Sequence, residues 1–272
     1  MPTPSEAKTK AAKTYNAAAD AFDLSANSFW DRFGRRTIDQ LDLLSGARCL
    51  DVCCGSGASA IPAAKKVAPH GSVLGVDLAE GLLELARAKA ARQGIENIEF
   101  RAGDMLDLGL PDSHFDAVVC VFGIFFIPDM PGAVRELWRM VAPGGVLAIT
   151  TWGPRFFEPA NTAFWEAVAA VRPELYKGFN PWDRISDPAT LRAMLEEGGV
   201  HDVQAASETG VHPLRSPEDW WAAVLGSGYR GTIEQLEPAE REQVRTANLT
   251  AIRAGGVAAV EANVLYATAI KP

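Results

Sequence analysis

Short apolar runs separated by longer amphipathic segments characterise residues 48–151. The runs have the length of strands, and the segments between several of them repeat apolar residues at helical spacing. The predicted strands are 48–53, 72–77, 97–101, 115–121 and 146–151, and the predicted helices are 57–68, 80–93 and 131–141. Strands that alternate with helices through short joins predict an open parallel sheet covered on both faces. Because the joins after the strands lie at one edge of such a sheet, a ligand is expected there.

The pattern changes on both sides of this region. Two helices are predicted before it, over the Ala-rich residues 5–22 and over residues 28–44. After residue 151, aromatic residues and prolines are frequent. Further helices are predicted at 188–197, 217–225 and 238–254, and further strands at 200–207 and 257–270. The expected fold is therefore a Rossmann-like, doubly wound α/β protein with a mostly parallel seven-stranded sheet, an N-terminal helical segment and a helical, aromatic-rich cap.

Composition narrows the classes of function. The 272 residues include 26 Lys and Arg against 34 Asp and Glu, a net charge of −8, and a broad nucleic-acid surface would need clustered basic residues instead. No apolar stretch reaches the roughly 20 residues that a membrane span needs. The N-terminus lacks an apolar signal region, so a cytoplasmic protein is expected. The four cysteines lack metal-ligand spacing, which predicts buried reduced thiols and no metal site.

A small-residue turn follows the first predicted strand. Gly55 and Gly57 allow a ligand to approach the backbone, and the helix that begins there presents unpaired amides. With Ala60 they also fit the spacing of dinucleotide-binding turns, so an NAD(P)-dependent oxidoreductase is an alternative. Asp51, within the strand, distinguishes the two interpretations. Its carboxylate would repel a pyrophosphate but would stabilise an ammonium group.

Two further acids follow the next two strands. Asp77 can accept hydrogen bonds from both hydroxyls of a ribose, and Asp104 can accept one from an exocyclic amino group. Leu78 and Met105 lie beside these acids in sequence and could enclose a purine ring. A ligand with an ammonium group, a ribose and an adenine is S-adenosylmethionine.

On these motifs, residues 48–151 resemble the class I S-adenosylmethionine-dependent methyltransferases, especially the ubiquinone/menaquinone-biosynthesis and natural-product enzymes. The matching pieces are Leu50–Gly57, Gly75–Asp77, Gly103–Met105, Phe115–Val119 and Pro143–Val146. The Tyr15-to-Asp23 segment is similar to the aromatic segment that folds over the cofactor in that subgroup. The resemblance implies these cofactor-binding residues: Tyr15, Asp51, Cys53, Gly55, Ser56, Gly57, Asp77, Leu78, Gly103, Asp104, Met105, Val121 and Phe122.

Two departures from the family pattern stand out. Cys53 replaces the first glycine of the turn, which is tolerated if its φ is negative. The Arg-rich N-terminal signature of the quinone enzymes is not evident, which leaves a quinone substrate open.

Methyl transfer requires alignment and exclusion of water, and a general base only for a neutral hydroxyl acceptor. The segment after the fourth predicted strand is apolar, so a base would have to come from the cap, where His212 is the candidate. A small, aromatic or hydrophobic acceptor is expected because aromatic residues are concentrated outside the core. The candidate substrate-binding residues are Phe22, Trp30, Phe33, Phe125, Phe126, Trp152, Phe156, Trp182 and Trp221.

The resulting prediction has three parts. Residues 1–46 form an N-terminal helical lid, residues 47–152 the cofactor-binding core, and residues 153–272 cap insertions with the last helix and strands of the sheet. The expected activity is methyl transfer from S-adenosylmethionine to O, N or C of a small molecule, by a monomer or homodimer. A nucleic-acid methyltransferase is disfavoured by the acidic charge and the apolar Phe122–Phe126 segment. A non-catalytic S-adenosylmethionine-binding protein is a further alternative.

Overall fold

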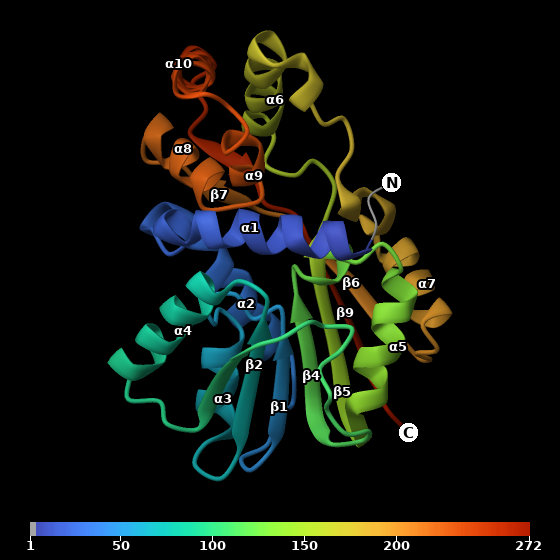
Figure 1. The fold of residues 1–272 in the computed structure, drawn as a ribbon. Coiled ribbons are helices and arrows are strands. Elements are labelled where there is room, and N and C mark those ends of the chain that lie inside the picture. The colour runs from blue at the N-terminus through green and yellow to red at the C-terminus, as the bar shows by residue number, and fades with distance from the viewer. Residues whose placement is uncertain (1–3) are drawn as a thin grey trace.

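The computed structural model describes residues 4–272, and within them seven strands form one sheet (Figure 1). The strands are β1 (Arg48–Val52), β2 (Ser72–Asp77), β3 (Ile98–Ala102), β4 (Phe115–Val121), β5 (Val141–Trp152), β6 (Gln204–Glu208) and β9 (Val264–Ile270). Their order is β3-β2-β1-β4-β5-β9-β6, and β9 is antiparallel to both neighbours. The predicted fold class, a mostly parallel seven-stranded Rossmann-like sheet, is confirmed.

Helices cover both faces of the sheet because successive strand residues point in opposite directions. Cys49 of β1 packs in one apolar cluster with residues of α2 (Phe29–Asp39), α3 (Ala60–Val67) and α4 (Glu80–Arg92). Leu50, the next residue, packs in the other cluster with α5 (Met130–Met140) and α7 (Pro188–Glu197). Strand β1 is therefore buried on both faces, and only its first residue, Arg48, is exposed.

The N-terminal helix α1 (Pro4–Phe22) lies across the carboxyl edge of the sheet, between the core and the cap (Figure 1). A short turn, η1 (Ser25–Asn27), joins it to α2. Helix α2 packs very closely on the turn after β1, since a Cβ at Gly34 would lie 2.5 Å from the backbone carbon of Ala58.

The cap follows β5. It contains α6 (Ala160–Val171), the turns η3 (Pro173–Leu175) and η4 (Pro181–Ile185), α8 (Pro217–Leu225), α9 (Arg230–Ile233) and α10 (Pro238–Ala254). A two-stranded sheet of β7 (Val211–Pro213) and β8 (Ala259–Glu261) completes it. Among residues 4–272, no helix is both long and apolar enough to cross a bilayer.

Several predicted boundaries were wrong. The helix predicted from residue 57 begins at Ala60, because the turn before it contains residues with positive φ. Strand β6 begins at Gln204 instead of residue 200, and α2 ends at Asp39 instead of residue 44. The long last strand is divided into β8 and β9 at Asn263, whose side-chain amide donates to the carbonyl of Pro154 (3.0 Å). This hydrogen bond fixes Asn263 to the loop after β5 and so interrupts the regular strand pairing at the junction of β8 and β9.

Candidate functional site

A cavity of about 970 Å³, including its open mouth, lies where β1, β2, β3 and β4 end beneath α1. Eleven of the thirteen predicted cofactor-binding residues line it: Tyr15, Cys53, Gly55, Ser56, Asp77, Leu78, Gly103, Asp104, Met105, Val121 and Phe122. Asp51 and Gly57 are not among the lining residues. The sequence pattern therefore identified the cavity, because parallel strands bring their carboxyl ends to one edge.

The turn after β1 has an unusual backbone. Cys53, Gly55 and Gly57 all have positive φ, of 61°, 52° and 85°. A negative φ at Cys53, the condition under which the replacement of the first glycine was expected to be tolerated, is therefore not met. The chain reverses sharply here against the loop after β4, since a Cβ at Gly123 would lie 2.5 Å from that of Cys53. The fold imposes a left-handed conformation on a residue that ordinarily avoids it.

Asp77 joins two loops of the cavity. One carboxylate oxygen accepts from the amide of Gly55 (2.9 Å) and the other from the amide of Ala79 (2.8 Å). Burial raises the pKa of Asp77, while these hydrogen bonds oppose the shift. The Asp77 carboxylate, which can accept further hydrogen bonds, is thus held in place at the end of β2 against the glycine turn.

Asp51 is fully buried behind the cavity wall, which corrects the expectation that its carboxylate faces the turn directly. One oxygen accepts from the hydroxyl of Ser59 (2.6 Å), and Ser59 itself lines the cavity. The other oxygen has no partner within residues 4–272. Burial raises the pKa of Asp51 to about 7, and the charge of Asp77 adds to the shift.

Asp104 lies just after β3 and is hydrogen-bonded to helix α1. Lys8 of α1 donates to one of its oxygens, and the amide of Leu106 donates to the other (3.0 Å). Met105 is buried and Leu78 is half exposed, both on the cavity wall. The sequence analysis missed Lys8, because nothing in this Ala-rich helix distinguishes Lys8 from Lys10 and Lys13 as the residue that reaches a distant acid.

Helix α1 supplies further wall residues. Ala11, Ala12, Tyr15 and Phe22 line the cavity from this side. The Tyr15 ring meets those of Phe22 and Phe126 edge-on, with centroids 6.2 and 5.5 Å apart. Burial, followed by the charges of Asp77 and Cys53, raises the pKa of Tyr15 far above its ordinary value, so its hydroxyl stays protonated at neutral pH.

The structure does not bring His212 to the cavity. The imidazole is buried in β7, its Nε2 lies 2.8 Å from the carbonyl oxygen of Ala26, and its ring packs against Phe29. Burial lowers the pKa of His212, so the ring is neutral. His212 is therefore not placed to act as a general base in this cavity. The pairing of β7 with β8 directs its side chain into the core of the cap.

The predicted substrate-binding aromatics divide into two groups. Phe22, Trp30 and Phe126 line the cavity, whereas the other six do not: Phe33, Phe125, Trp152, Phe156, Trp182 and Trp221. Phe33, Trp152 and Trp221 are core residues. Trp182 contacts Phe125 and Phe156, with ring centroids 5.0 and 4.8 Å apart, and its Nε1 has no partner in the described part of the chain.

These features fit S-adenosylmethionine. The cavity wall has no Cβ atom at Gly55, whose φ is 52°, and Asp51 in the strand that leads into this turn has an unpaired carboxylate oxygen. The negative potential of Asp51 and Asp77 suits a cationic ligand more than a diphosphate.

Comparison with known proteins agrees with a site for S-adenosylmethionine. Residues 49–145 match the family model described as a methyltransferase domain. Nocamycin O-methyltransferase of Saccharothrix syringae is 29% identical over 275 residues, which cover 93% of this chain and 96% of that protein. Demethylmenaquinone methyltransferase of Listeria monocytogenes is 29% identical over 190 residues, which cover 66% of this chain and 80% of that protein.

Solved structures share the fold. The [4+2]-cyclase SpnF superposes with a TM-score of 0.61 at 17% identity, covering 99% of this chain and 97% of that one. Phosphoethanolamine N-methyltransferase 2 of Haemonchus contortus, solved with S-adenosylhomocysteine, gives a TM-score of 0.59 at 16% identity, covering 98% of this chain and 60% of that one. From the domain match and the relatives together, residues 49–145 form a methyltransferase domain, and the chain as a whole is similar to S-adenosylmethionine-dependent methyltransferases, whose cofactor is S-adenosylmethionine.

Proposed function

We propose that this methyltransferase acts on an O, N or C nucleophile of a small aromatic or hydrophobic molecule. One observation carries the proposal: the cavity has acids at the ends of β2 and β3 and an apolar wall at the end of β4. Val121, Phe122, Phe126, Ile127 and Trp30 form that wall. An acceptor that reaches the methyl group passes between apolar and aromatic surfaces, which favour apolar ligands.

The same proposal assigns the cofactor contacts. Asp77 accepts from the ribose hydroxyls, and Asp104 accepts from the adenine amine between Leu78 and Met105. The turn from Cys53 to Gly57 holds the amino-acid part of the cofactor, with Ser56 on its surface. Asp51 favours the ammonium group electrostatically from behind Ser59. Residues 1–46 act as the lid, 47–152 as the cofactor core and 153–272 as the cap.

Catalysis in this arrangement is mainly alignment. S-adenosylmethionine, held by these residues, would supply an electrophilic methyl group to the acceptor and would leave as S-adenosylhomocysteine. Phe122, Phe126 and Trp30 exclude water and hold the acceptor in line, an effect that can be worth roughly 7–11 kcal/mol. Tyr15 is held protonated, so it donates a hydrogen bond instead of removing a proton.

The missing base limits the acceptor. No histidine lines the described cavity, and its acids are committed to hydrogen bonds with backbone or lid. The acceptor must therefore be nucleophilic without help, as phenolates, carboxylates, enolates and amines are. The relatives act, by their names, on an oxygen of nocamycin and on demethylmenaquinone, which is compatible with this class.

The test is methyl transfer to a panel of substituted phenols, hydroxynaphthoquinols, aromatic carboxylic acids and aromatic amines. Mass spectrometry would detect methylated products, and calorimetry would measure binding of S-adenosylhomocysteine. We expect tight binding and product only from apolar, ionisable acceptors. Product from polar aliphatic amines alone, included as a comparison set, would contradict the proposed acceptor class.

A further inference from the structure

Polar side chains of the N-terminal helix and of Asp23, which follows it, contact the segments after β1, β2 and β3 on the acidic side of the cavity. Next to its C-terminal end, Asp23 accepts from the hydroxyl of Ser56 in the loop after β1 (2.6 Å). At its middle, Asn16 accepts from the amide of Gly81 in the segment after β2 (2.8 Å). Near its N-terminal end, Lys8 donates to Asp104 after β3. Opening the cavity from this side therefore requires breaking some of these contacts.

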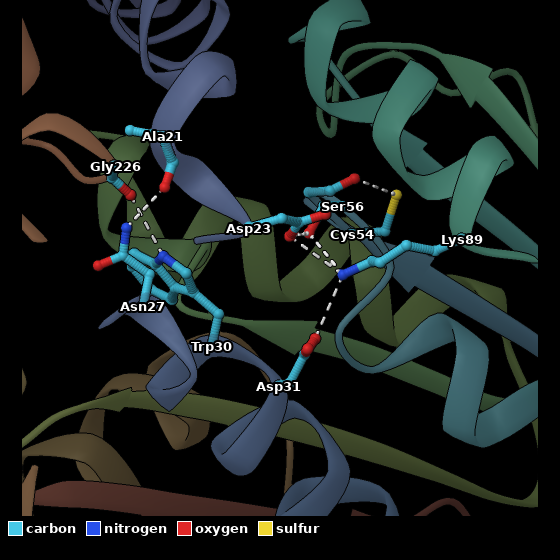
Figure 2. Close-up of polar contacts among 10 residues, drawn as sticks. Ala21, Asp23, Asn27, Trp30, Asp31, Cys54, Ser56, Lys89 and Gly226 are labelled. Carbon is cyan, nitrogen blue, oxygen red and sulfur yellow. Dashed lines mark hydrogen bonds and ion pairs between the residues drawn. The ribbon is translucent and has the colours of Figure 1, made fainter. Parts of the chain in front are cut away.

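The chain turns at Asp23, between the end of α1 and the start of α2, and this corner is bonded to the core by several polar groups. Figure 2 shows Lys89 of α4 between Asp23, Asp31 and Ser56, at 3.1, 3.3 and 3.0 Å. The Lys89 side chain is 13% exposed, against 26% for Lys8, so water screens the charge of Lys89 less than that of Lys8, although Asp31 is 60% exposed. Asp23 and Ser56 share the partly buried Lys89 ammonium group, so opening the corner would separate three mutually bonded polar groups.

The same corner is also fastened to the cap. The side-chain amide of Asn27 donates to the carbonyls of Ala21 (2.8 Å) and Ala222 (3.1 Å), and the indole of Trp30 donates to that of Gly226 (3.2 Å; Figure 2). Further along α1, Asp20 pairs with Arg230 of α9 (3.2 Å). The second half of α1 is thus held from both sides.

The N-terminal contact is different. Lys8 and Asp104 are each 26% exposed at the side chain, and an ion pair with that access to water is weakened by salt. Lys8, Ala11 and Ala12 line the cavity, so lifting this part of the helix would uncover it.

We propose that α1 is a lid hinged at the corner around Asp23, with Lys8 as its releasable latch on Asp104. The proposal rests on the adenine placement given under the proposed function. A carboxylate oxygen accepts more than one hydrogen bond, so Asp104 binds both Lys8 and the adenine amine. The latch therefore closes over bound cofactor, and the cofactor leaves when the first turns of α1 lift.

Dissociation of S-adenosylhomocysteine tests the latch. Trp30 lines the cavity, so stopped-flow tryptophan fluorescence can follow release. In the wild type, the dissociation rate should rise as NaCl is raised from 0.05 to 0.5 M, because salt weakens the ion pair. Lys8→Met should release the ligand about fivefold or more faster, with little salt dependence, and Lys8→Arg should restore the wild-type behaviour. Lys13→Met, an exposed lysine of the same helix, is the matched control and should behave as wild type.

Hydrogen exchange tests the hinge in the unmodified protein. Without ligand, amides near Lys8 should exchange faster than those near Asp23, and S-adenosylhomocysteine should protect mainly the former. Equal protection along α1, or Lys8→Met release that is unchanged or slower than wild type, would overturn the lid proposal. Slower release would mean that Lys8 competes with the cofactor for Asp104. If wild-type protein failed to bind S-adenosylhomocysteine by calorimetry, the cavity assignment itself would fail, which separates the two proposals.

Discussion

At the scale of single residues, the two acids Asp77 and Asp51 differ in whether their carboxylates reach the cavity. Asp77 lines the cavity, and its two oxygens fix the amides of Gly55 and Ala79. Asp51, two residues before the same turn, is buried and keeps one oxygen unpaired. We therefore expect similar carboxylates to have different tasks, with Asp77 in contact with the ligand and Asp51 acting on it from behind the cavity wall.

We predict that Asp77→Ala weakens S-adenosylhomocysteine binding about tenfold or more, because charge-neutral alanine cannot accept from the ribose hydroxyls. Calorimetry would give the dissociation constant and circular dichroism would verify the fold. Glu84→Ala, an exposed acid on α4, is the control. An unchanged dissociation constant in folded Asp77→Ala protein would remove the ribose assignment.

Asp51 should leave a signature in the pH dependence of stability. Its pKa is raised from 3.8 to about 7 on folding, so between these values the folded chain keeps a proton that the unfolded chain releases. The free energy of unfolding therefore falls as the pH rises from about 4 to 7, by on the order of 3 kcal/mol from this group. Denaturant unfolding without ligand should reveal a steeper fall in wild type than in Asp51→Asn. Parallel curves for the two proteins would contradict the assignment.

At the scale of elements, the cavity depends on how closely α2 can approach the turn after β1. Gly34 faces the backbone of Ala58, and there is no room for a Cβ. A small residue on one helix lets two backbones touch, and this contact supports the turn that carries Ser56 and Gly57. The packing of an element outside the core thus shapes the cofactor site.

Gly34→Ala tests this contact. The added methyl group should displace α2 and lower the free energy of unfolding by roughly 1–3 kcal/mol, as overpacking does. Thermal melting and S-adenosylhomocysteine affinity would be measured together, and both should decrease. Arg35→Ala, on the next and exposed position, controls for the helix itself. A wild-type melting temperature in Gly34→Ala would show that the helix can shift without cost.

At the scale of the whole molecule, the core and the cap divide the work. In the proposed function, the strand ends provide the cofactor contacts and the cap surrounds the approach to the β4 wall. Trp182, Phe125 and Phe156 form an aromatic group next to that wall but outside the cofactor cavity. Substitutions in the cap should therefore change binding of the methyl acceptor without changing binding of the cofactor.

Trp182→Ala should raise the KM for the acceptor about tenfold while the Kd for S-adenosylhomocysteine stays unchanged, because the indole contributes apolar contact area to the acceptor alone. Steady-state kinetics with the best acceptor of the panel would measure the KM, and calorimetry would measure the Kd. Tyr176→Ala, an exposed aromatic residue of the cap, should change neither. Equal losses in both quantities would place Trp182 in the cofactor site.

Local sequence alone determined the strands, the helices between them and the acids at the ends of β2 and β3. These features depend on periodicity and on the geometry of parallel strands, which act over a few residues at a time. Only the tertiary structure decided that Cys53 takes a positive φ, that Asp51 lies behind the wall, that His212 is buried in the cap and that Lys8 reaches Asp104. Each of these depends on segments far apart in the chain that pack against one another, and no local pattern records which distant side chain fills a given space.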